Sequence, residues 1–354
     1  MTTASNLKFM KVLLAVLLLL SLSKGIAQHV NESLFVHYQL ETPSLGKVTI
    51  HVTKALNSTS ERPLLLYLDG SGNMPIFYKK KSGKYSTSVP LDVKRYINDY
   101  YVVLISKPGI PLSDSLRYTE TGQGYYPTNP QYNSLYSLEW RAESASQTID
   151  LLLQKLPIDK SRIIVMGYSE GSQVAPRVAV LNKRVTHVAC FVGNALNHFY
   201  DFLLAARLRV EKNEITPEQG QKIVDSLYAQ YEAIYKSPTD TTRRWYGATY
   251  QKWASFCKTV PLESMLTLDI PILYVAGGRD RNQTILDMDY AKLEFIRKGK
   301  TNLTYKVYPN CDHFLQEERT INGNNEKVDR LDEAQQFALD WANQSKKLYI
   351  PKIA

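Results

Sequence analysis

The sequence predicts an α/β fold in which a mostly parallel sheet is flanked by helices and interrupted by a helical cap. Short apolar runs typical of buried strands recur along the chain, and helical stretches separate most of them, as in sheets covered on both faces. The 354 residues, of which 44% are hydrophobic and 22% charged, can bury a sizeable core, which excludes a disordered or collagen-like chain. One interval of about 75 residues carries helical patterning only and is far longer than an ordinary connection.

Residues 1–27 indicate a secretory signal peptide. Basic residues precede an almost wholly aliphatic run over 12–22, and small residues occupy the two positions that signal peptidase reads, ending at Ala27. The apolar run is roughly half of the 20 residues that a transmembrane anchor needs. We therefore expect cleavage after Ala27 and a mature chain, residues 28–354, in the periplasm or the medium without a stable membrane anchor.

Charge and motifs argue against several function classes. Lys and Arg (43) exceed Asp and Glu (34), but a net charge of +9 spread over the chain is weak evidence for a nucleic acid partner. The sequence has no H-E-x-x-H, no Walker loop and no G-x-G-x-x-G after a strand, so we expect no metal and no nucleotide or other cofactor. Cys190, Cys257 and Cys311 form no C-x-x-C pair and allow at most one disulfide, so buried thiols are favoured.

The strands of the expected sheet follow one another along the chain. Alternating apolar residues over 34–39 and 47–53 predict an opening hairpin. The apolar run 63–68 ends at the Asp-Gly-Ser-Gly turn of residues 69–72, as a buried strand does. Further buried strands are predicted at 101–106, 162–166, 185–193, 270–276 and 303–308, with long helices at 135–156 and 333–342. Catalytic groups of such sheets lie in the loops at the carboxyl ends of the strands.

Residues 197–268 form the predicted cap. Thr216 is a helix N-cap, Pro217 suits the first turn, and Gln219 completes a capping box. Apolar residues then repeat at helical spacing at Ile223, Val224, Leu227, Tyr228, Tyr231, Ile234 and Tyr235. We therefore expect a helical insertion before the strand 270–276.

The strongest chemical signal is the G-x-S-x-G pentapeptide of residues 167–171. It follows a predicted strand and precedes a helical stretch, and chance would rarely produce it in a chain with 17 glycines. A sharp strand-to-helix turn holds the central serine in a strained conformation, and glycines two positions away let the chain pass closely. Negative charge is favoured at the following helix N-terminus. The pattern predicts Ser169 as a nucleophile.

A serine nucleophile needs a histidine base. Of six histidines, four lie at the expected cleavage site, in the opening hairpin or at the start of a strand, which leaves His198 and His313. His313 lies just past the strand 303–308, where a loop can return it over the sheet. It is favoured over His198, which lies at the start of the predicted cap.

The base in turn needs an orienting carboxylate. Asp280 follows the strand 270–276 and a glycine turn, which is where the acid is expected. Asp312 is the rival, but its position next to the base suits a role in shaping the loop. Asp287 and Asp289 fall in the following helical stretch, where a solvated face is expected.

An oxyanion hole requires two backbone N–H groups aimed at the reacting carbonyl oxygen. One is expected from Glu170, the residue after the nucleophile. The other is expected from the turn after the strand 63–68, at Ser71, although Gly72 would serve as well.

With these residues in place, the chain resembles the α/β-hydrolase superfamily over residues 34–346. The turn at Asp69 resembles the His-Gly-x turn of lipases and esterases, with aspartate in place of histidine. The stretch 156–162 before the nucleophile is similar to that of dienelactone-hydrolase-like and prolyl-oligopeptidase-like members, many of them exported esterases or peptidases. The resemblance implies an α/β-hydrolase fold over 28–354, and a Ser-His-Asp hydrolase of ester, thioester or amide bonds. The chain order of nucleophile, acid and base is also the one expected for this superfamily.

The expected substrate is a small molecule or short peptide. Tyr125 and Tyr126, in the loop after the strand 101–106, Trp245 in the cap and Tyr168 beside the nucleophile are candidates for its binding wall. Packing of cap against core is the alternative for these aromatic side chains. Esters are favoured over amides because an alkoxide or phenolate leaves more readily than an amine. A peptidase or aminopeptidase, and a binding protein without catalysis, are the alternative functions.

Overall fold

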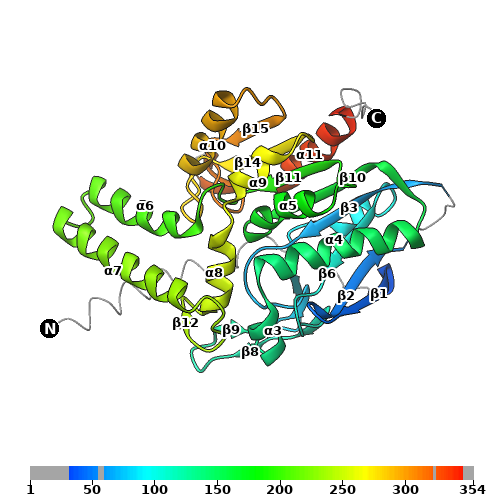
Figure 1. Ribbon diagram of the computed structural model, residues 1–354, viewed down its shortest axis with the longest axis horizontal. Helices are drawn as coiled ribbons and strands as arrows, with labels where there is room; N and C mark the ends of the chain where they lie inside the picture. The colour runs from blue at the N-terminus through cyan, green and yellow to red at the C-terminus, as the bar shows by residue number, and fades with distance from the viewer. Residues whose placement is uncertain (1–31, 55–59, 322–323, 346–354) are drawn as a thin grey trace.

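The computed structural model describes residues 32–54, 60–321 and 324–345, so the predicted signal peptide lies outside the described residues. The main sheet has eight strands in the order β1-β2-β6-β3-β10-β11-β14-β15 (Figure 1). Strand β1 pairs with β2, and β2 with β6, in antiparallel fashion, and all other neighbours are parallel. The strands are β1 (Phe35–Thr42), β2 (Gly46–Thr53), β3 (Arg62–Leu68), β6 (Tyr101–Ile105), β10 (Ile158–Tyr168), β11 (His187–Phe191), β14 (Ile272–Gly277) and β15 (Leu303–Tyr308).

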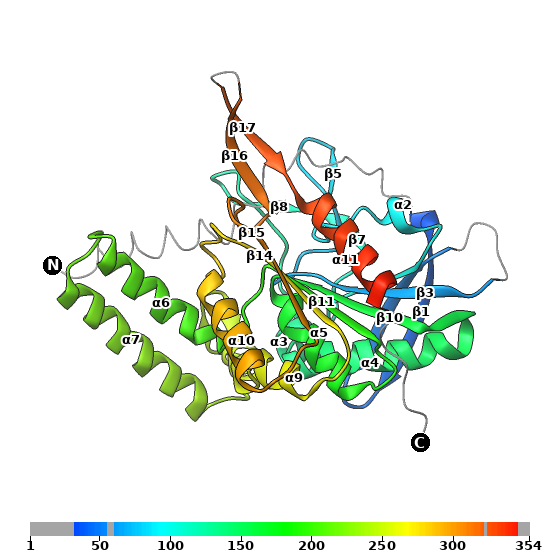
Figure 2. The same ribbon diagram turned by 90° about the horizontal axis from the view of Figure 1, so that it is seen from above.

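Helices cover both faces of this sheet (Figure 2). The helices are α2 (Val93–Tyr96), α4 (Leu138–Lys155), α5 (Glu170–Leu181), α9 (Pro261–Thr267), α10 (Ile285–Arg297) and α11 (Leu331–Ser345). Leu64 and Leu66 of β3 point into the core under α4, α5, α9 and α10, whereas Leu65 and Tyr67 point into the core under α2 and α11. Both faces of the strands are therefore buried, which explains their continuous apolar sequences.

The predicted cap region extends from the side of the sheet domain (Figure 1). Helices α6 (His198–Glu211) and α7 (Pro217–Lys236) form a hairpin, and both hydrogen bonds of the predicted capping box at Thr216 are present. Helix α8 (Tyr250–Lys258) returns the chain to the core. The expectation of helices alone was wrong, because β12 (Arg244–Trp245) and β13 (Ala248–Thr249) form a small hairpin whose turn has Tyr246 and Gly247 at positive φ.

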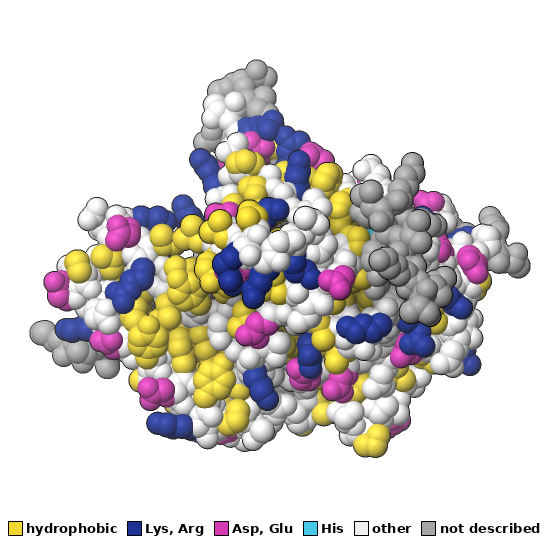
Figure 3. Space-filling view, turned by 45° about the horizontal axis from the view of Figure 1, so that its top comes forward, with side chains coloured by type: hydrophobic (Ala, Val, Ile, Leu, Met, Phe, Trp, Pro, Cys, Tyr) yellow, Lys and Arg dark blue, Asp and Glu magenta, His cyan; other side chains and the backbone are white. Residues whose placement is uncertain are grey.

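Aromatic side chains hold the cap together. Phe199, Tyr231 and Trp253 are buried in a separate apolar cluster, with the Phe199 and Tyr231 rings stacked at 3.9 Å between centroids. In Figure 3, hydrophobic side chains gather on the part of the surface that carries the cap. Tyr200 and Tyr228, on its two long helices, are 42% and 51% exposed. The cap thus has its own core and an apolar outer face.

Short strands outside the main sheet were not predicted. The hairpin of β16 (Gln316–Ile321) and β17 (Asn324–Asp329) projects from the molecule before α11 (Figure 2). Its sequence is rich in charged and amide residues and lacks the alternation of apolar residues that predicts a strand. The other short strands are β4 (Phe77–Lys79), β5 (Tyr85–Thr87), β7 (Ser113–Ser115), β8 (Arg117–Tyr118) and β9 (Gly124–Tyr125), and α3 (Pro130–Leu135) precedes α4.

The three cysteines, Cys190, Cys257 and Cys311, are buried and unbridged. Burial raises the pKa of the Cys311 thiol to about 11.

Within the part of the chain that the structure describes, no helix combines the length and apolar character needed to cross a membrane.

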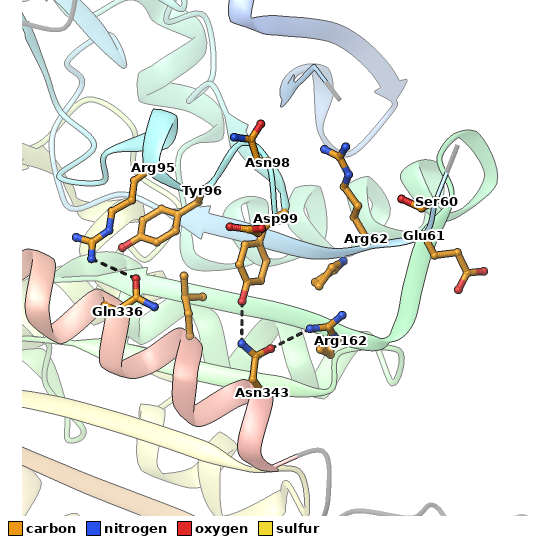
Figure 4. Close-up of a pocket in the computed structure, with 13 residues that line it drawn as sticks. Ser60, Glu61, Arg62, Arg95, Tyr96, Asn98, Asp99, Arg162, Gln336 and Asn343 are labelled. Carbon is orange, nitrogen blue, oxygen red and sulfur yellow. Dashed lines mark hydrogen bonds between the residues drawn. The ribbon is translucent and has the colours of Figure 1, made fainter. Parts of the chain in front are cut away.

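A cavity of about 470 Å³ opens at the amino ends of β3 and β10 (Figure 4). Arg62, Arg95 and Arg162 line it, and each guanidinium already donates a hydrogen bond to a protein acceptor. Because catalytic loops lie at the carboxyl ends of parallel strands, this cavity is at the opposite end of the sheet from the predicted site.

Candidate active site

Ser169 lies in the strained turn that its sequence predicts. It follows β10 and precedes α5, with φ 52° and ψ −118°. A Cβ added to Gly167 would lie 2.2 Å from the carbonyl oxygen of Gly171, and one added to Gly171 would lie 2.1 Å from that of Leu68. Only glycine fits at either position, so the pentapeptide is required by the close passage of the chain.

The structure brings Ser169, His313 and Asp280 together. The Nε2 atom of His313 lies 3.1 Å from Oγ of Ser169, and its Nδ1 atom lies 2.7 Å from Oδ2 of Asp280. The second oxygen of Asp280 accepts hydrogen bonds from the backbone N–H groups of Asn282 (2.8 Å) and Gln283 (2.9 Å). These bonds fix the carboxylate, the carboxylate fixes the imidazole, and the imidazole is placed to accept the serine proton.

The loop that carries His313 is shaped by its neighbours. Oδ1 of Asp312 accepts the N–H groups of Phe314 and Gln316, so this aspartate orders the loop and does not contact the imidazole as its acid. The hydroxyl of Tyr168 donates to the carbonyl of His313 at 2.8 Å. Tyr168, a candidate for the substrate wall, is buried, and its hydroxyl is engaged by the loop that carries His313.

His198, the other candidate base, belongs to a different environment. It opens α6, stacks on Phe202, and has its Nδ1 atom 3.2 Å from Nε2 of Gln173. Burial, reinforced by the charge of Lys252, lowers its pKa to about 3. It is therefore a neutral packing residue of the cap.

Two buried cations hold the glycine turn after β3. Nζ of Lys107 donates to the carbonyl oxygens of Gly70 (2.6 Å) and Gly72 (2.7 Å), and Nη2 of Arg141 donates to that of Asp69 (2.9 Å). In a planar trans peptide the N–H points opposite to the carbonyl, so the Gly70 carbonyl bond aims the N–H of Ser71 away from Lys107.

The same turn lies against the nucleophile. A Cβ added to Gly70 would lie 3.5 Å from Cβ and 3.9 Å from Oγ of Ser169. Within the described residues, the N–H groups of Ser71 and Gly72 donate no hydrogen bond. The N–H of Glu170, in the first turn of α5, likewise has no partner one turn earlier in the helix. The glycine turn that carries Ser71 and Gly72 thus adjoins Ser169 at Gly70, and none of the three predicted donors makes a hydrogen bond through its N–H within the described residues.

The candidate substrate residues lie in different settings. Asn73, in the glycine turn, donates to the carbonyl of Tyr126 at 2.8 Å, so the segment of Tyr125 and Tyr126 adjoins the site. The Tyr126 phenol donates to Asp114, whereas Tyr125 is 42% exposed. Trp245 packs into the aromatic cluster of the cap. Tyr125 alone of these three presents a free, exposed side chain.

A buried carboxyl pair, Asp201 of α6 and Asp287 of α10, is a feature that the sequence does not predict. Asp287 is fully buried in the first turn of α10, where a solvated residue was expected, and its carboxyl faces that of Asp201 of α6, a contact that needs a proton on one of the two. Nδ2 of Asn194 donates to Asp201 at 2.9 Å. Burial raises the pKa of both carboxyls, and the charge of Asp287 raises that of Asp201 further. In the described part of the chain, no group of three or more His, Cys, Asp or Glu is arranged to hold a metal ion.

The protein is similar to known proteins in structure and not in sequence. No family model and no curated protein matches the sequence. The structure is similar to the Porphyromonas gingivalis dipeptidyl peptidase 4 (14% identity, TM-score 0.51, 88% of this chain and 35% of that one). It is also similar to the α/β hydrolase GrgF from Penicillium sp. sh18 (13% identity, TM-score 0.52, 88% of this chain and 98% of that one). The chain has the α/β-hydrolase fold.

A third similar structure is the Pyrococcus horikoshii acylaminoacyl peptidase, at 12% identity and a TM-score of 0.52. The alignment covers 90% of this chain but only 43% of that peptidase. The chain therefore spans less than half the length of either peptidase, whereas it matches GrgF over nearly the whole of that hydrolase. At these identities the likeness concerns the α/β-hydrolase fold.

Proposed function

We propose that the protein is a serine hydrolase that cleaves carboxylic ester bonds through Ser169, His313 and Asp280. The observation that carries the proposal is the unbroken chain of contacts from Asp280 to His313 to Ser169, which ends on a serine in strained backbone. Packing alone gives no reason to align a carboxylate, an imidazole and a hydroxyl in this order.

The geometry supports a two-step acyl transfer. Oγ of Ser169 attacks the substrate carbonyl while Nε2 of His313 takes its proton and then delivers it to the leaving alcohol. Asp280 holds the imidazole and stabilises its charged form. A water molecule, deprotonated by the same histidine, then releases the acid. In both steps the N–H groups of Glu170 and Ser71 bind the negative oxygen, with Gly72 as the alternative second donor.

Ester substrates suit the residues around this centre. An ester releases a good leaving group, so the three residues and the oxyanion donors suffice. The cap glutamates that could bind a peptide amino terminus, Glu211, Glu214 and Glu218, are exposed and lie at the outer turn of the α6–α7 hairpin (Figure 1). The apolar cap and the exposed Tyr125 favour a medium-sized acyl or aryl ester.

A peptidase is the second candidate. Two of the similar solved structures are named as a dipeptidyl peptidase and an acylaminoacyl peptidase, and such enzymes use this fold. The same three side chains can cleave an amide when the substrate is anchored well enough to position its amine leaving group.

A substrate panel separates the two functions. It compares nitrophenyl esters, acetylated sugars and proline or alanine nitroanilides, with Ser169→Ala as the inactive control. We expect kcat/KM for the best ester to exceed that for the best anilide, and Tyr125→Ala to change the preference among esters. Anilide turnover equal to or above ester turnover would assign a peptidase. No turnover of any substrate, with Ser169→Ala binding the same ligands as the wild type, would instead indicate a binding protein.

We propose further that the enzyme acts outside the cytosol after removal of residues 1–27. The support is the sequence pattern of a basic, an apolar and a small-residue region. Mass spectrometry of the exported protein should give Gln28 as the first residue. Retention of residues 1–27 on membrane-bound protein would contradict this.

A further inference from the structure

Helix α8 of the cap carries a lysine into the interior of the sheet domain. Nζ of Lys252 lies 2.7 Å from Oε2 of Glu170, the residue that follows the nucleophile, and both side chains are buried. The same Nζ atom lies over the rings of Trp253 (4.3 Å) and Phe256 (4.7 Å). The two rings thus shield the ion pair from water on the cap side. Charge interactions are stronger in such surroundings than in water.

Glu170 also belongs to the sheet domain's own ion pairs. Nη1 of Arg141 lies 3.5 Å from its Oε1 atom, and the Tyr136 hydroxyl donates to the same oxygen. Through its other nitrogen, Arg141 binds the carboxylate and carbonyl of Asp69. Arg141 therefore joins the start of α5 to the glycine turn, which are the two segments that supply the oxyanion donors.

The charges of this buried group do not cancel. Three basic groups, Lys107, Arg141 and Lys252, face the two carboxylates of Asp69 and Glu170. Burial lowers the pKa of Lys107, and its contact with Asp69 at 2.8 Å opposes this shift. Burial would raise the pKa of Glu170, but the neighbouring cations hold it at about 2, so this carboxylate is ionised at neutral pH. With Lys107 protonated, one positive charge of this group has no carboxylate partner, and the group contacts both the glycine turn and the side chain of Glu170.

We propose that Lys252 is a positioning residue for the oxyanion hole, so that docking of the cap completes the site for the transition state. This inference rests on the proposed serine hydrolase function. The lysine anchors the Glu170 side chain and with it the first turn of α5, whose N–H is an oxyanion donor. It also supplies the excess positive charge, which an oxyanion on Ser169 would balance.

The docking of α8 onto the core supports this role. The backbone N–H of Leu138, at the start of α4, donates to Oγ of Ser255 at 3.1 Å, and the Phe256 ring lies 6.1 Å from that of Tyr136. Ser255 and Phe256 follow Lys252 by three and four residues, so all three lie on one face of α8. The lysine therefore reaches Glu170 only when this face of α8 is packed on α4. If a bound substrate displaced the cap, the site would lose the charge of Lys252.

The test compares Lys252→Met with Lys252→Arg, which keeps the charge, and with Lys258→Met, an exposed lysine at the end of the same helix. Each variant is assayed with the best ester and with a trifluoromethyl ketone. In the ketone adduct, Ser169 Oγ bonds to the carbonyl carbon, its proton passes to His313, and the former carbonyl oxygen becomes an oxyanion. The ketone therefore reports on the oxyanion hole, and KM reports on ground-state binding.

We expect Lys252→Met to lower kcat on the order of 10- to 100-fold with KM little changed, a smaller loss than removal of an oxyanion donor itself. The inhibition constant of the ketone should rise by the same factor, because both quantities depend on the oxyanion. Lys252→Arg should recover most of the loss, and Lys258→Met should match the wild type.

Each variant is assayed well below its Tm, where the folded state predominates, because reversible unfolding would itself raise the apparent inhibition constant. Under these conditions a loss of active enzyme lowers the apparent kcat and leaves the inhibition constant unchanged. An unchanged kcat and inhibition constant in Lys252→Met would overturn the positioning role while leaving the hydrolase function intact. If Lys252→Met does not fold, Glu170→Gln with Lys252→Met removes the anchoring ion pair and leaves the excess of one positive charge over the carboxylates unchanged. Normal ketone binding by that variant would overturn the positioning role of Lys252. A wild type that turns over no substrate, or a Ser169→Ala variant as active as the wild type, would instead refute the proposed function.

Discussion

His313 and Asp280 lie 33 residues apart in the chain, yet the Nδ1 and Oδ2 atoms of their side chains are 2.7 Å apart. The contact joins the loop after β15 to the loop after the neighbouring parallel strand, β14. Because the Asp280 side chain is almost fully buried, the pair is shielded from solvent and keeps the imidazole in one orientation.

Replacing Asp280 should therefore impair turnover far more than binding. We expect Asp280→Asn to lower kcat by about 10³- to 10⁴-fold with KM little changed, because an amide no longer holds the imidazole in the tautomer that accepts the serine proton. The matched control is Asp269→Asn, an exposed aspartate before the same strand, which should keep full activity. Equal activity of Asp280→Asn and wild type in steady-state ester hydrolysis would show that Asp280 is not the acid.

The glycines around the nucleophile should differ in their effect on stability. Gly171→Ala forces a Cβ to 2.1 Å from the carbonyl oxygen of Leu68, so we expect a loss of several kcal/mol, more than the roughly 1–3 kcal/mol of ordinary overpacking. Gly70→Ala makes only ordinary van der Waals contacts, the nearest at 3.5 Å from Ser169. Thermal unfolding should show a much lower Tm for Gly171→Ala than for Gly70→Ala. Similar Tm values would mean that the turn relaxes and does not require glycine.

The buried pair of Asp201 and Asp287 should make stability depend on pH. Its raised pKa values mean that the folded protein keeps a proton that the unfolded chain, with aspartate pKa near 3.8, releases. The folded state then binds more protons than the unfolded state, so stability falls as pH rises above the unfolded value and through the raised pKa.

Asp201→Asn should remove this dependence. An amide can accept from Asn194 and donate to Asp287 without taking up a proton, so we expect a higher Tm than the wild type, with a larger gain at pH 8 than at pH 5. Asp289→Asn, an exposed neighbour on α10, should show no such trend. A pH-independent or negative change in Tm for Asp201→Asn would contradict the shared proton.

The sequence predicted those parts of the site whose chemistry constrains neighbouring residues. Ser169 could be recognised because its turn demands glycines two positions away, and Asp280 could be placed because a glycine turn after a buried strand marks a strand end. Strand β3 could be predicted because burial on both faces leaves an unbroken apolar run.

The residues that the sequence did not reveal act through long-range contacts. Lys107, Arg141 and Lys252 are single charged residues within ordinary segments, and only the fold brings them to the same two carboxylates. Asp287 was expected in solvent because a charged residue in an amphipathic helix is normally exposed. Its burial follows from a partner on α6, a helix from the inserted cap.

Covalent labelling of the nucleophile tests the central proposal most directly. Purified protein is treated with a fluorophosphonate, digested and analysed by mass spectrometry, with Ser169→Ala treated in parallel. We predict one phosphonylated peptide, modified at Ser169, no labelling of Ser169→Ala, and loss of ester hydrolysis in proportion to labelling. Failure to label the folded wild type, or equal labelling of Ser169→Ala, would contradict the assignment of Ser169 as the nucleophile of a serine hydrolase.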